Sequence, residues 1–62
     1  MNEIFTIVCY NGVGKLDGIN TKIKFASETE LEALRKQYSI YFSQRHGIDE
    51  SKLKIYFYYN QI

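Results

Sequence analysis

The chain has 62 residues, of which 45% are hydrophobic and 24% are charged, and its formal net charge is +1. A chain of this length forms a single domain, and its composition is typical of a folded protein and not of a disordered one. No apolar run approaches the roughly 20 residues that span a membrane, and the apolar start lacks the basic residues of a secretory signal. We therefore expect a cytoplasmic protein.

Residues 4–10 predict the first β-strand, because they are dense in β-branched and aromatic side chains. Alternation divides them into two apolar sets, with Phe5, Ile7 and Cys9 on one face and Ile4, Val8 and Tyr10 on the other. A strand that is apolar on both faces is typically central in its sheet or covered on both sides. Cys9, the only cysteine, cannot form a disulfide within the chain and is expected to be an unreactive core residue.

Residues 11–18 predict a hairpin connection with two competing turn signals. Asn11-Gly12 and Asp17-Gly18 each suit a two-residue type I′ turn, in which both central residues need a positive φ. The turn at Asp17-Gly18 is slightly favoured, with residues 11–14 as a bulged stretch, and the turn at Asn11-Gly12 is the alternative. The run from Asn11 to Lys15 is not a phosphate-binding loop, because its glycine spacing is wrong and a strand follows it.

Residues 19–26 predict the second strand, in which apolar Ile19, Ile23 and Phe25 alternate with polar Lys22 and Lys24. One face of this strand should therefore be buried and the other exposed to water.

Residues 28–46 predict an α-helix with well-marked ends. Ser27 is placed as the N-cap, Glu30 completes a capping box, and Gly47 supplies a left-handed stop. The apolar face of this helix comprises Leu31, Leu34, Tyr38, Tyr41 and Phe42. His46 lies in the last turn, where it complements the helix dipole, and its closeness in sequence to Ser43 and Asp49 does not make a catalytic triad.

Residues 52–59 alternate again and predict the third strand. The resulting ββαβ order is an α+β fold. Its simplest sheet is antiparallel or mixed, with three strands in the order 2-1-3 and the helix packed on one face.

The sheet face away from the helix is the main candidate interaction surface. It should present lysines and tyrosines from the second and third strands, namely Lys22, Lys24, Lys52, Lys54, Tyr56 and Tyr58. Tyrosine favours strands and lysine protects sheet edges, so a plain solvated face would carry the same residues. Interleaved rings and cations also suit single-stranded nucleic acid, although the near-neutral net charge favours a contact with protein, including a second copy of the chain.

The outer side of the helix is a secondary candidate. An uncharged stripe on it could accept another helix, and it consists of Ala33, Gln37, Ile40 and Gln44.

No residue pattern indicates catalysis, and no cofactor or small-molecule substrate is expected. A zinc site needs about four ligands, and Cys9 and His46 are the only soft ones available. The sequence therefore predicts a non-catalytic protein-interaction module, homodimeric and without membrane contact, acting as a small inhibitor or accessory factor of the kind that mobile-element genes encode. Binding of single-stranded nucleic acid through the tyrosine- and lysine-rich face is the alternative.

Overall fold

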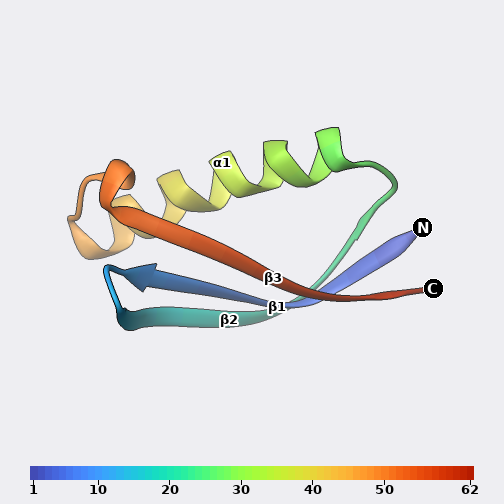
Figure 1. Cartoon of the computed structure of the whole chain (residues 1–62), viewed down its shortest axis with the longest axis horizontal. Coiled ribbons are helices and arrows are strands. Elements are labelled where there is room, and N and C mark those ends of the chain that lie inside the picture. Colours follow the sequence, from blue (N-terminus) through green and yellow to red (C-terminus); the bar gives the residue numbers. More distant parts are fainter.

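A computed structural model describes all 62 residues and shows a three-stranded sheet with one α-helix on one face (Figure 1). The elements in chain order are β1 (Asn2–Asn11), β2 (Gly14–Phe25), α1 (Glu28–His46), the 3₁₀ turn η1 (Glu50–Lys52) and β3 (Leu53–Gln61). The strand order is β2-β1-β3, and β1 is antiparallel to both neighbours. This confirms the predicted α+β class, the ββαβ order and the central place of the first strand.

β1 supplies much of the core, because three of its residues, Ile4, Ile7 and Cys9, are fully buried. Ile4 and Ile7 share a face although they are three residues apart, since the pairing shifts register between Ile4 and Thr6. This β-bulge inserts Phe5, which is exposed. The prediction that Phe5 shares a face with Ile7 and Cys9 was therefore wrong, as was the placement of Ile4 on the opposite face.

The hairpin turns at Gly12-Val13, between the paired residues Asn11 and Gly14. Gly12 has φ of 66°, in the left-handed region that glycine adopts without a steric penalty. The favoured turn at Asp17-Gly18 was wrong, and the observed turn lies one residue beyond the alternative at Asn11-Gly12. Asp17 and Gly18 both lie inside β2, which begins at Gly14 and not at residue 19. β2 continues through Asp17-Gly18 without turning, and its pairing with β1 shifts register opposite Cys9 and Tyr10.

α1 has the predicted bounds because both of its ends are capped. The Ser27 hydroxyl accepts a hydrogen bond from the Glu30 backbone N–H, and the Glu30 carboxylate accepts one from the N–H of Ala26, at 2.8 Å. Gly47, with φ of 67°, closes the other end by donating to the Ser43 carbonyl. These bonds satisfy backbone groups that a helix end otherwise leaves unpaired.

β3 begins at Leu53, because the three residues before it form η1. The Asp49 side chain caps η1 by accepting a hydrogen bond from the Ser51 N–H. Lys52 therefore belongs to a 3₁₀ turn, and its predicted place in the third strand was wrong.

The core lies between α1 and the sheet and contains eight buried residues, Ile4, Ile7, Cys9, Phe25, Leu31, Phe42, Leu53 and Ile55, while the ninth buried residue, Val8, lies on the opposite face of the sheet. Leu34 and Tyr38 of the predicted helix face pack against this core, whereas Tyr41 is exposed. No other element of the chain covers the far side of the sheet (Figure 1).

Candidate functional site: the open sheet face

The open face is the side of the sheet turned away from α1, and the strand register places its residues in rows. Paired residues on neighbouring antiparallel strands point to the same side, so each row crosses all three strands. Starting from the turn, the rows are Lys15–Tyr10–Lys54, Gly18–Val8–Tyr56, Asn20–Thr6–Tyr58 and Lys24–Glu3–Asn60. A hydrogen bond of 3.2 Å from the Thr6 hydroxyl to the Asn20 side chain links two strands within the third row.

The aromatic side chains of the open face are exposed, apart from half-buried Tyr10, and they contact one another. Tyr56 and Tyr58 are each 49% exposed. The Tyr10 and Tyr56 rings meet edge to face with centroids 5.4 Å apart, and the Phe5 ring lies 6.5 Å from that of Tyr58. Rings in such pairs lose little further entropy when a partner covers them, because their neighbours already restrict them.

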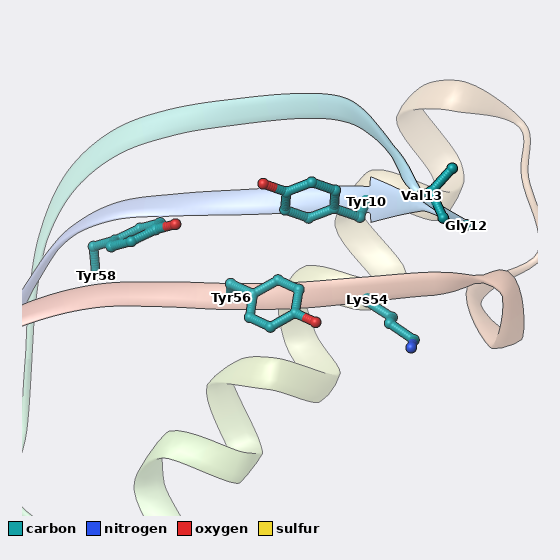
Figure 2. Close-up of a pocket in the computed structure, with 6 residues that line it drawn as sticks. All are labelled: Tyr10, Gly12, Val13, Lys54, Tyr56 and Tyr58. Atoms are coloured by element: carbon teal, nitrogen blue, oxygen red, sulfur yellow. The ribbon is translucent and has the colours of Figure 1, made fainter.

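A shallow hollow lies at the turn end of this face. Its volume is about 390 Å³, and it is lined by Tyr10, Gly12, Val13, Lys54, Tyr56 and Tyr58. Figure 2 shows the three tyrosines on one side of the sheet, with the α1 ribbon behind it and the Lys54 side chain extending past the β3 ribbon. No lining residue is a histidine, a cysteine or a carboxylate, so the hollow offers flat rings and one cation but no acid–base pair.

The turn end of the open face is positively charged. Lys15 and Lys54 flank Tyr10 in the first row, and both are exposed. Neither forms a salt bridge, since the ion pairs of this protein use Arg35, Lys36, Arg45 and His46 as cations. The one acidic residue in the four rows is Glu3, at the opposite end beside Lys24.

The structure brings together half of the predicted face and adds residues to it. Lys54, Tyr56 and Tyr58 lie together in the hollow. Lys24 joins the last row of the face, at the far end from the hollow. Lys22 is exposed on β2, between the paired residues Asn20 and Ile23, and lines no part of the hollow. Lys52 lies outside the sheet, in η1.

Tyr10 and Lys15 were not among the residues predicted for the open face. Alternation alone could not say which face of the first strand meets the helix, and Lys15 was placed in the hairpin loop. A two-residue turn at Asn11-Gly12 would have put Lys15 on the strand opposite Val8, whereas the observed turn at Gly12-Val13 sets it opposite Tyr10.

The secondary candidate stripe on α1 is exposed along its whole length. Ala33, Gln37, Ile40 and Gln44 all face solvent, and Ile40 is 37% exposed. A single exposed isoleucine among uncharged residues is ordinary for a protein surface, so the stripe has less binding character than the open face.

A polar cluster on the other side of the sheet joins the hairpin to the end of α1. Asp17 Oδ2 lies 2.8 Å from His46 Nε2 and 3.0 Å from Arg45 Nε. The hydrogen bond with His46 is the main cause that lowers the pKa of Asp17, followed by the bond that the Gly18 N–H donates to it. Burial, with a smaller effect of the Asp17 charge, raises the pKa of Cys9. A thiol of that kind is a poor nucleophile.

No three histidine, cysteine or carboxylate side chains gather in a group that could hold a metal ion. No helix combines the length and the apolar character that crossing a lipid bilayer requires. Comparison with protein-family models, with curated proteins and with solved structures found no match, so functional inference starts from the open face itself.

Proposed function

We propose that this chain is a non-catalytic protein-interaction module, such as a small inhibitor or accessory factor, and that its open face binds an acidic surface of a partner protein. The observation that carries the proposal is the row Lys15–Tyr10–Lys54 beside the exposed rings of Tyr56 and Tyr58. Tyrosine is enriched at protein interfaces, where one end of the ring is buried and its hydroxyl keeps a hydrogen bond.

Charge complementarity supports a partner of acidic character. The lysines of the first row have no carboxylate on their own chain, so glutamates or aspartates of a partner would be the first to pair with them. Such pairs at the rim mainly speed association, while the central aromatic rings supply most of the affinity.

Site-specific photo-crosslinking tests this proposal. A benzophenone side chain in place of Tyr56 should capture one partner in an extract of the source cells, and the crosslink should map to an acidic segment of that partner. The same group in place of Ile40, on the helix stripe, is the matched control and should capture nothing specific. Capture at Ile40 and not at Tyr56 would move the interface to the helix.

Charge reversal then tests the role of the first row with the captured partner. Lys54→Glu should weaken binding at least about tenfold, because it replaces an attraction by a repulsion at the interface. Lys36→Glu on α1, outside the open face, should leave binding unchanged. Equal affinities of the two variants would contradict the proposed surface.

Single-stranded nucleic acid is a second candidate, because the hollow places flat rings beside Lys54. Bases stack on such rings, and lysine neutralises the neighbouring phosphate. The net charge of +1 makes this the weaker candidate, since nucleic-acid-binding domains are usually strongly basic. A fluorescent dT₁₂ oligonucleotide in low salt tests it: binding that is lost in Tyr56→Ala and falls steeply with salt would favour it over the protein partner.

A further inference from the structure

The two edges of the sheet differ in how well they are protected against pairing with another strand. β2 forms one edge and β3 the other, because β1 lies between them. An unprotected edge strand presents unpaired backbone N–H and C=O groups to any neighbouring chain, and natural sheets block such pairing with lysines, prolines or bulges, while glycines weaken the strand itself.

β2 carries several of these protective features. Its pairing with β1 is irregular in two places, opposite Ile4–Thr6 and opposite Cys9–Tyr10. It also contains Gly14 and Gly18 and three exposed lysines, Lys15, Lys22 and Lys24. This edge is therefore irregular and charged along most of its length.

β3 carries almost none of them. Its nine residues contain no glycine or proline, and Lys54 is its only charged residue. The register shift in its pairing with β1 comes from the extra residue Phe5, while Tyr58 and Tyr59 follow one another without a gap. Residues 55–59 are all β-branched or aromatic, which are the residue types that favour strands.

The outer side of β3 is also accessible. A groove of about 280 Å³ is lined by residues from both faces of β3 together with two from α1, namely Leu53, Lys54, Ile55, Tyr56, Arg35 and Ser39. A groove that touches both faces of β3 must lie at its edge, and β1 occupies the inner edge. Arg35 donates a hydrogen bond to the Ile55 carbonyl there, and a carbonyl oxygen can accept a second one.

We infer that β3 pairs antiparallel with β3 of a second copy around a two-fold axis at Phe57, which joins two chains into one six-stranded sheet. This register pairs all nine residues of the strand. On the open face it sets Tyr56 opposite Tyr58 of the second copy, and on the helix side it sets Ile55 opposite Tyr59. Within β3 no two like charges stand opposite each other, because Lys54 meets Asn60. The one cation near the axis is Arg35 of α1, whose guanidinium lies 5.2 Å from the centre of the Phe57 ring.

The charge of the open face argues against the other symmetric arrangement. Two copies stacked through their open faces with the turn ends together would bring the lysines of the first row close to those of the partner, without acidic residues in between. Edge pairing avoids this repulsion. It also leaves both open faces free on the same side of the joined sheet, so self-association and partner binding do not compete.

Cysteine crosslinking tests the register directly. Tyr56→Cys and Tyr58→Cys chains mixed together should form an intermolecular disulfide at least about tenfold faster than either chain alone, since directly opposite residues have Cβ atoms about 5 Å apart and diagonal ones do not. Lys22→Cys, on the β2 edge, is the matched control and should not crosslink. All of these chains also contain the buried Cys9, so any crosslinking through Cys9 is the same in each of them.

Amide hydrogen exchange gives a second readout that requires no substitution. In a single chain, alternate N–H groups of β3 face solvent, whereas in the paired dimer both sets are bonded, so consecutive amides from Lys54 to Asn60 should exchange slowly. Sedimentation should show twice the 7.3 kDa mass.

Three outcomes would overturn the inference: a monomer at several hundred micromolar, slow exchange at alternate β3 amides only, or fastest crosslinking of Tyr56→Cys with itself. None of these bears on partner binding by the open face, which the Lys54→Glu variant tests separately.

Discussion

Asp17 forms the ion pairs that link the hairpin to the end of α1. Its carboxylate contacts Arg45 and His46 at once, although 28 and 29 positions separate it from them in the sequence. Both cations lie in the last helical turn, where they also complement the helix dipole. Removing the Asp17 charge should therefore loosen the hairpin from the helix without disturbing either element.

The contacts of Asp17 make stability dependent on pH. The pKa of Asp17 is lowered in the folded chain, so its contribution to stability is complete above the ordinary aspartate pKa of about 3.9 and is lost as the pH falls toward the folded value. Asp17→Asn should lower Tm at pH 7 and reduce the further loss of Tm below about pH 5. Thermal unfolding followed by circular dichroism at a series of pH values measures both effects.

A double-mutant cycle identifies the partner of Asp17. The effects of Asp17→Asn and His46→Ala should add to more than that of the double variant, because each removes the same contact. Asp49→Asn is the control: the pKa of Asp49 is also lowered, but by the hydrogen bonds from Ser51. Its effect should be additive with that of His46→Ala, and strictly additive effects for Asp17 would show that the contact contributes nothing.

At the scale of single elements, local signals sufficed for the helix. Ser27, Glu30 and Gly47 lie within one turn of the ends that they define, so the bounds of α1 could be read from neighbouring residues. The strand order could also be predicted, because a strand that is apolar on both faces belongs in the middle of a small sheet.

The hairpin could not be predicted in the same way. Asn11-Gly12 and Asp17-Gly18 are locally equivalent, and pairing along the whole of β1 and β2 places the turn at Gly12-Val13 instead. The bulge at Phe5 could not be predicted either, because no glycine marks the point at which the alternation of the β1 side chains between the two faces is interrupted. The turn prediction left Lys15 in the hairpin connection, and the unrecognised 3₁₀ turn η1 left Lys52 in a strand, which is why only part of the candidate site was found.

Glycine substitutions test the observed turn. Gly12 has a positive φ and nothing within 4 Å of an added Cβ, so Gly12→Ala should cost about 1–2 kcal/mol through backbone strain alone. Gly18 lies in a strand, where an added Cβ would make ordinary contacts at 3.5 Å, so Gly18→Ala should have little effect. Urea unfolding of the two variants measures the difference, and the reverse ranking would indicate a turn at Asp17-Gly18.

The N-cap of α1 gives a second test at this scale. Ser27→Ala removes the hydroxyl that accepts from the Glu30 N–H, at a cost of about 1 kcal/mol. Ser27→Asp keeps an acceptor at that position and should restore most of the stability, as measured by urea unfolding. A Ser27→Asp variant as unstable as Ser27→Ala would mean that Ser27 acts through packing and not as a cap.

At the scale of the whole molecule, the limiting quantity is the size of the core. The sheet is covered on one side only, and a core of eight buried side chains holds it to a single helix. Chains of this length have a free energy of unfolding of about 3 to 9 kcal/mol. A second copy at the β3 edge would add to it by mass action, so Tm should rise with protein concentration if the dimer forms.

A substitution at Phe42 tests how small the free energy of unfolding is. Its ring is fully buried at the centre of the cluster formed by α1 and the sheet, and it contacts the Tyr38, Tyr41 and His46 rings. Phe42→Ala removes buried apolar surface and leaves a cavity, at a cost of about 3–5 kcal/mol, which is comparable with the whole stability of the chain. We expect this variant to be largely unfolded at 25 °C in far-ultraviolet circular dichroism. Tyr41→Ala, one position earlier and 40% exposed, should remain folded, and a folded Phe42→Ala chain would show that the free energy of unfolding exceeds the cost of the cavity.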